Sequence, residues 1–148
     1  MNSNDEVLKN MARIARSGRD FFADVHVRVR DPEVRAAFAY IGDVHARLLR
    51  DVSPWLPPAE HGGDHVDRTS PAALAEKMYA NVRRTFRGDA PAAVANELGF
   101  GEAQLCRLLE RAFDAADTPA LQQVLKSYYA ELLICRQAMS RLHARLAA

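Results

Sequence analysis

Apolar and polar positions alternate with a helical period along the chain of 148 residues. Apolar or small side chains recur at alternating spacings of four and three, which is typical of helices that bury one face against other helices. This spacing predicts two helices in the first third of the chain. Their buried faces are Val7, Met11, Ile14, Gly18, Phe21 and Val25 in the first, and Val34, Phe38, Ile41, His45, Leu48 and Val52 in the second.

Capping residues set the expected limits of these helices. Ser3 and Glu6 have the spacing of a capping box, and the first helix is expected to end near Arg30. Asp31 followed by Pro32 predicts the start of the second helix, because aspartate caps a helix and proline fits its first position.

Three further helices are expected, one short and two long. The short one spans about 71–87, with Leu74, Met78, Val82 and Phe86 on its buried face. The next is expected to open at Asp89 and Pro91, and the last at Thr118 and Pro119. Their buried faces are Val94, Leu98, Gly101, Leu105, Leu108 and Ala112, and then Leu121, Leu125, Tyr128, Leu132, Cys135, Met139, Leu142 and Leu146.

The connections between these helices are unequal. The first pair and the last pair of long helices are each joined by a few residues, whereas the crossover segment 53–90 separates the two pairs. One long crossover between two tight hairpins is typical of ferritin-like bundles. We therefore expect an all-α, ferritin-like four-helix bundle in one domain, residues 1–148, with an extra short helix in the crossover.

Composition and charge narrow the functional classes. Lys and Arg number 20 against 19 Asp and Glu, so the basic excess of nucleic-acid-binding proteins is missing. No apolar run is long enough for a membrane span, and the N-terminal residues lack the apolar core of a secretory signal. Cys106 and Cys135 have no metal-binding spacing and are expected to be free thiols, with Cys106 partly exposed and Cys135 buried. These features predict a cytoplasmic protein.

Several stretches resemble a known family. They are "NDEVLKNM", "DPEVRAAFAYI", "RGDAPAAVANELGFGEAQL" and "YYAEL", and the most specific points are the Gly-Asp turn at 88–89 and Gly101-Glu102. Over residues 4–146 the chain resembles a bacterial ferritin-like four-helix-bundle family that is catalogued as a domain of unknown function. The resemblance implies a ferritin-like bundle, and it implies no particular activity.

The ligand set of ferritin-like di-iron proteins is incomplete in this sequence. That set needs an inward Glu on two helices and Glu-x-x-His on the other two. His45 lies on a buried face, but Gly42 stands where the glutamate should precede it, and Ile134 stands where a histidine should follow Glu131. We therefore expect no cofactor. The alternative is a degenerate site for iron or another divalent metal, formed by His45, Glu97, Glu102 and Glu131.

The middle of the predicted core offers a second interpretation of His45. Gly18 and Gly101 should leave space there, which His45 and Tyr128 could fill as a polar pair. On this interpretation His45 is a structural residue of the core. A third alternative is a small apolar ligand bound in a pocket beside the two glycines.

Two polar clusters outside the helix faces are interpreted as solvated surface. Residues 60–67 hold Glu60, His61, Asp64, His65 and Asp67, whose spacing matches no metal motif. Arg83, Arg84 and Arg87 lie near the end of a helix, where basic side chains complement the helix dipole.

Three apolar residues, Phe100, Leu133 and Ile134, fall outside the buried faces and predict an interaction surface. The leading functional hypothesis is therefore a non-enzymatic bundle that acts through protein contacts, in a bacterial stress or envelope response. A homodimer or an unidentified protein partner is expected, without nucleic acid.

Overall fold

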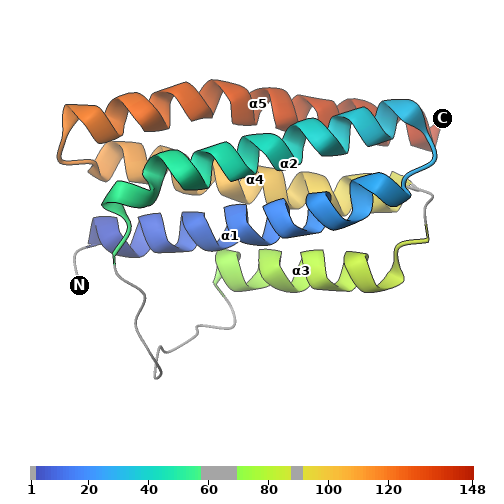
Figure 1. Ribbon diagram of the computed structural model, residues 1–148, viewed down its shortest axis with the longest axis horizontal. Coiled ribbons are helices and arrows are strands. Elements are labelled where there is room, and N and C mark those ends of the chain that lie inside the picture. The colour runs from blue at the N-terminus through green and yellow to red at the C-terminus, as the bar shows by residue number, and fades with distance from the viewer. Residues whose placement is uncertain (1–2, 58–69, 88–91) are drawn as a thin grey trace.

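The computed structural model describes residues 3–57, 70–87 and 92–148, and within these residues all regular structure is helical (Figure 1). The helices are α1 (Ser3–Val25), α2 (Pro32–Val52), α3 (Pro71–Thr85), α4 (Ala92–Ala115) and α5 (Pro119–Ala147), with short 3₁₀ turns η1 (His26–Arg28) and η2 (Ser53–Trp55). The all-α class predicted from the sequence is confirmed. None of the described helices is both long and apolar enough to span a membrane.

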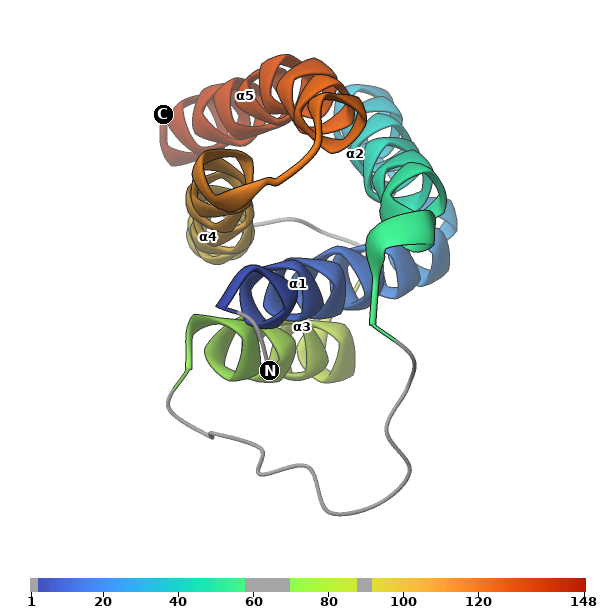
Figure 2. The ribbon, with the colours of Figure 1, turned by 90° about the vertical axis from the view of Figure 1, so that its left-hand side faces the viewer.

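The four long helices surround one apolar core. Going round the ring, α1 packs on α2, α2 on α5, α5 on α4, and α4 on α1 (Figure 2). Helix α3 lies outside this ring, against α1 and α4. The chain reverses direction at each successive helix, so α2 and α4 run the same way at opposite corners of the ring (Figure 1).

The helix starts that fall in the described residues agree with the sequence. The Asp31 side chain accepts a hydrogen bond from the backbone N–H of Glu33 at 2.9 Å, and Pro32 is the first residue of α2. Thr118 accepts one from the N–H of Leu121 at 3.3 Å. These bonds satisfy amide groups that the first turn of a helix leaves without partners.

Some predicted features lie outside the described residues. They are the side chain of Ser3, the helix start at Asp89 and Pro91, and the polar cluster at 60–67. Of the three arginines predicted as solvated surface, Arg83 forms an ion pair with Asp24 of α1 at 2.8 Å. Arg84 and Arg87 are exposed.

Helix α1 ends earlier than the expected Arg30. The α-helix stops at Val25 and continues as a 3₁₀ turn, because the chain must reverse before Asp31 and the intervening β-branched residues have low helix propensity. Arg35 of α2 binds two carbonyl oxygens at this end, those of His26 at 3.2 Å and Val27 at 3.0 Å.

Only part of the face predicted for α3 is buried: Val82 and Phe86 are buried as expected, but Leu74 and Met78 are not. Leu74 is 45% exposed and Met78 is only half-buried, whereas Tyr79 is buried. The buried face consists of Ala72, Ala75, Tyr79 and Val82, followed by Phe86 just beyond the helix. Two alanines on this face let α3 lie close to α1 and α4, and Tyr79 is the large buried side chain at mid-helix.

Helix α4 is covered on three sides, by α1, α3 and α5. Its buried surface is therefore wider than the single face predicted, and it includes Glu102 and Gln104. Cys106, expected to be partly exposed, is 2% exposed for the same reason. Cys135 of α5 is buried, as predicted.

A buried histidine, glutamate and tyrosine as the candidate functional site

His45 of α2 and Glu102 of α4 meet in the centre of the core. The distance between Nε2 of His45 and Oε1 of Glu102 is 2.9 Å, and neither side chain has exposed surface. The two helices occupy opposite corners of the ring and share few contacts, so this pair bridges the core itself. An isolated ionised carboxylate in such surroundings is very costly, so a buried carboxyl group is normally paired or protonated.

The contact between these two side chains is incomplete. Although 2.9 Å is a hydrogen-bond distance, the alignment is not that of a hydrogen bond, so the two side chains form a close polar contact without a hydrogen bond. Both ring nitrogens of His45 and both carboxylate oxygens of Glu102 consequently lack a hydrogen-bond partner among the described residues. Buried polar atoms are seldom left without partners, and each costs about 1–3 kcal/mol. The pair therefore has capacity for a further group.

Two glycines create the space in which the histidine lies. A Cβ atom on Gly18 of α1 would lie 2.2 Å from Nδ1 of His45, far inside van der Waals contact. A Cβ atom on Gly101 of α4 would lie 2.6 Å from the hydroxyl oxygen of Tyr79. Any larger residue at either position would displace the ring that now fills the space.

Tyr79 reaches this cluster from outside the ring. It belongs to α3, and its hydroxyl lies against both glycines, 3.2 Å from the position that a Cβ of Gly18 would take. The hydroxyl is buried and has no hydrogen-bond partner among the described residues. Burial, and then the charge of Glu102, raises the pKa of Tyr79 well above 10, so the phenol is neutral.

Aromatic rings and thiols surround the polar atoms. The Phe22 ring packs edge-on against the His45 ring at 5.8 Å between centroids. Burial, and then the charge of Glu102, raises the pKa of the Cys106 thiol to about 11, and the same two causes raise the pKa of Cys135. Both thiols are therefore neutral and unreactive in the folded protein.

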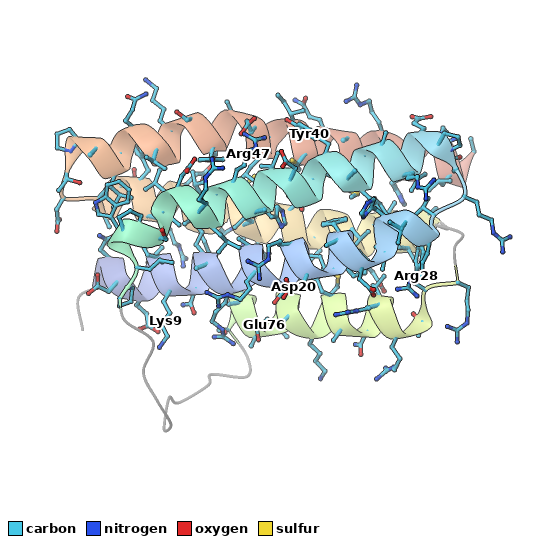
Figure 3. The ribbon with its side chains drawn as sticks, in the orientation of Figure 1. Lys9, Asp20, Arg28, Tyr40, Arg47 and Glu76 are labelled. Atoms are coloured by element: carbon cyan, nitrogen blue, oxygen red, sulfur yellow. The ribbon has the colours of Figure 1, made fainter. Side chains whose placement is uncertain are left out.

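Two ionic contacts hold α3 in place beside the cluster. Arg13 of α1 binds Glu76 through two hydrogen bonds of 2.8 and 3.0 Å, and Glu76 lies between the two helices in Figure 3. Near the other end of α3, Arg83 binds Asp24 at 2.8 Å. These contacts flank Tyr79 and fix the position of the helix that carries it.

The structure brings together only part of the metal-ligand set considered from the sequence. His45 and Glu102 meet, whereas Glu97 is exposed on α4. Glu131 of α5 binds Arg47 of α2 at 3.0 and 3.2 Å, and both side chains are partly exposed. Within the part of the chain that the structure describes, no three His, Cys, Asp or Glu side chains form a metal site by themselves. The residues present do not fit a di-iron centre, which needs about four carboxylates.

The predicted pairing of His45 with Tyr128 is wrong. The Tyr128 hydroxyl donates a hydrogen bond to Asp51 near the end of α2 instead. Burial, and then this bond, raises the pKa of Tyr128 to about 12. Tyr79 fills the mid-core position instead. It could have been found from the sequence, because it follows Ala75 by four residues and therefore lies on the same face of α3.

The predicted apolar pocket beside Gly18 and Gly101 is also wrong. His45 and Tyr79 occupy the space that the glycines leave, and the Met78 methyl group lies 2.9 Å from the position of a Cβ on Gly101. A ligand at this point would have to displace a buried side chain.

The apolar residues predicted as an interaction surface are only partly exposed. Ile134 is 47% and Phe100 40% exposed, whereas Leu133 packs against the core. The other exposed large apolar residues among those described are Val27, Tyr40 and Leu74. The five lie one each on η1, α2, α3, α4 and α5, so no single helix presents an apolar stripe.

Comparison of the chain with protein-family models, with curated proteins and with solved structures found no match. The family resemblance described above therefore stays a prediction, and function is argued from the site alone.

Proposed function

We propose that this protein is a ferritin-like four-helix bundle that binds one divalent metal ion at His45 and Glu102 and has no catalytic role of its own. The observation that carries this proposal is the fully buried pair with its 2.9 Å Nε2–Oε1 distance and its atoms without hydrogen-bond partners. The proposed site has fewer ligands than a di-iron centre and holds one ion in place of two.

The chain topology supports the ferritin-like part of the proposal. Helix hairpins α1–α2 and α4–α5 pack against each other, and every neighbouring pair in the ring is antiparallel. The long crossover containing α3 returns the chain along the bundle, so that α2 and α4 run in parallel. A single long crossover of this kind is the feature that separates ferritin-like bundles from simple up-and-down ones.

The geometry of the pair supports metal binding. Two ligand atoms that each lie about 2.1 Å from one ion are about 3.0 Å apart in octahedral geometry and about 3.4 Å apart in the tetrahedral geometry of zinc. The observed 2.9 Å is close to the octahedral spacing, and the atoms of the pair have no hydrogen-bond partner among the described residues. Glu102 can supply its second oxygen as well, and imidazole with carboxylate suits zinc, iron and manganese.

Electrostatics favours the same conclusion. The carboxylate of Glu102 lies among apolar side chains and two neutral thiols, and it raises the pKa of each neighbouring acid. A divalent cation would neutralise this charge and give the orphaned oxygens a partner. Removal of the Glu102 charge should therefore abolish metal binding without opening a cavity.

Elemental analysis of protein without a histidine tag tests the proposal. Cells are grown with added iron, manganese and zinc, and wild type is compared with Glu102→Gln and His45→Ala. His26→Ala is the matched control, because His26 of η1 is a half-buried histidine whose Nδ1 lies 2.9 Å from the backbone carbonyl oxygen of Phe22 in α1. We expect about one ion per chain in wild type and in the control, and loss of the ion in the other two.

A metal content far below one per chain in wild type would overturn the proposal. His45 and Glu102 would then be a structural ion pair. Metal that persists in both site variants would place the ion elsewhere, outside this cluster.

A second candidate function is action through protein contacts. It is favoured by Ile134, which is 47% exposed although its neighbours on α5 pack into the core. We propose a homodimer through the outer helix faces, in the cytoplasm, where the free thiols Cys106 and Cys135 stay reduced. Native mass spectrometry at tens of micromolar tests this: a dimer weakened by Ile134→Asp supports it, and a monomer at all concentrations refutes it.

A further inference from the structure

Helices α4 and α5 form a groove between them, close to the turn that joins them (Figure 1). Its volume is about 430 Å³. Sites for small molecules have volumes of about 300–1,000 Å³, so this groove is large enough for a small organic ligand. It lies apart from the buried pair at mid-core.

Apolar side chains form the floor and the walls of the groove. Leu109 and Leu125 are buried, whereas Phe113 and Tyr129 are half-buried and pack against the core. Each helix therefore supplies one leucine and, four residues later, one aromatic ring. Ligand sites are lined mainly by apolar and aromatic side chains, with a few polar groups that fix the orientation of the ligand. This lining fits the apolar body of a ligand.

The polar groups of the groove lie at its two ends. The hydroxyl of Tyr129 donates a hydrogen bond of 2.6 Å to Oε1 of Glu110, so these two residues lie level with each other. The helices are antiparallel (Figure 1), and Asp114 and Lys126 therefore both lie about one turn closer to the joining turn. Their opposite charges offset each other at that end. The negative charge that remains belongs to Glu110.

Glu110 has the surroundings that recognise an organic cation. Its side chain is exposed at the rim and forms no ion pair with any residue that the structure describes. The hydrogen bond from Tyr129 holds one carboxylate oxygen, which leaves Oε2 open to a ligand. The aromatic ring of Tyr129 lines the same end of the groove, and such rings attract ammonium groups.

We propose that this groove binds an organic ammonium ion that carries an apolar body. The ammonium group pairs with Glu110 beside the ring of Tyr129. The apolar body lies along Leu109 and Leu125, against Phe113. A ligand with the same body and a carboxylate in place of the ammonium is repelled at Glu110, so the site selects by charge as well as by shape. This inference does not depend on metal binding at mid-core.

Three probes with the same phenyl body test the proposal. Phenethylamine is positively charged at neutral pH, phenethyl alcohol is uncharged, and hydrocinnamate is negatively charged. Each is titrated into the protein, and the shifts of backbone amide signals in NMR spectra give both the location and the affinity of binding.

The variants separate the charge from the apolar wall. Glu110→Gln removes the charge and keeps an oxygen that can accept the hydrogen bond from Tyr129. Phe113→Ala removes part of the wall and keeps the charge. Glu97→Gln is the matched control, because it removes an exposed carboxylate of the same helix that does not line the groove.

In wild type we expect shifts along the groove, with the strongest binding for phenethylamine and the weakest for hydrocinnamate. Glu110→Gln should weaken phenethylamine binding about fivefold and leave binding of the alcohol unchanged, because only an exposed ion pair is lost. Phe113→Ala should weaken both, and Glu97→Gln neither. Equal affinity for the three probes, an unchanged phenethylamine affinity in Glu110→Gln, or shifts confined to other surfaces would overturn the inference.

Discussion

The most direct test of the core geometry is Gly18→Ala. The added methyl group would lie 2.2 Å from Nδ1 and 2.4 Å from Cε1 of His45, where about 3.5 Å is the normal limit of contact. The ring would have to move by more than an ångström. It has no free direction, because Phe22 packs on it and Glu102 contacts Nε2.

The size of the effect follows from two opposing contributions. Overpacking a buried position costs about 1–3 kcal/mol, and the displaced ring here is also paired with a carboxylate, which places the cost at the upper end. Alanine is favoured over glycine in a helix by about 1 kcal/mol, which offsets part of that cost. We expect Gly18→Ala to lower the free energy of unfolding by about 2 kcal/mol.

Gly99→Ala is the matched control. Its methyl group would meet nothing closer than the Cβ of Met139, at 3.9 Å, and a shallow groove lined by Gly99 has room for it. Only the helix preference of alanine then remains, so this variant should gain about 0.5–1 kcal/mol.

Urea unfolding followed by circular dichroism measures both variants. For a chain of this size, about 2 kcal/mol corresponds to a melting temperature roughly 4–8 °C lower. The slope with urea should not change, because the unfolded surface is the same. Equal or higher stability of Gly18→Ala than wild type would refute the packing of His45 against α1.

Three further outcomes are expected. Glu76→Gln removes the charge that pairs with Arg13, and it should lower the free energy of unfolding by about 0.5–1 kcal/mol at low salt. The loss should be smaller at high salt, because both side chains are partly exposed. An unchanged urea midpoint would show that this contact does not hold α3 in place. The hydrogen bond from Arg50, and then that from Tyr128, lowers the pKa of Asp51 below 3.8. Asp51 therefore contributes its full share to the free energy of unfolding above pH 3.8, and this contribution is lost as the pH falls through the folded-state pKa. In Asp51→Asn the free energy of unfolding should consequently fall less steeply below pH 3.8. Because burial raises the pKa of Cys106 to about 11, iodoacetamide should label it only after unfolding, and mass spectrometry that finds rapid labelling of the native protein would contradict its burial.

Much of the candidate site could not be predicted from single helix faces. His45 was placed correctly on the buried face of α2, because its neighbours repeat with the spacing of that face. Glu102 was considered as a ligand but lies beside the predicted face of its helix. It is buried because α3 and α5 cover both flanks of α4. The periodicity of a single helix cannot predict this burial, because it depends on how three helices pack.

The rotation of α3 was the least predictable element. The predicted face holds Leu74, Met78, Val82 and Phe86. The structure buries Val82 and Phe86, and it buries Ala72, Ala75 and Tyr79 in place of the other two. The reason lies on other helices, because Gly18 of α1 and Gly101 of α4 leave the space that receives Tyr79.

The sequence by itself determined the helices of this protein, their caps at Asp31 and Thr118, and the apolar faces of the long ones. Those features depend on residues within a few turns of each other, and their period and capping chemistry are visible in the chain. Only the tertiary structure decided that His45 meets Glu102 and Tyr79 and does not meet Tyr128. Helix order, rotation and close approach at two glycines set that choice, and these depend on the packing of α1, α2, α3 and α4 together.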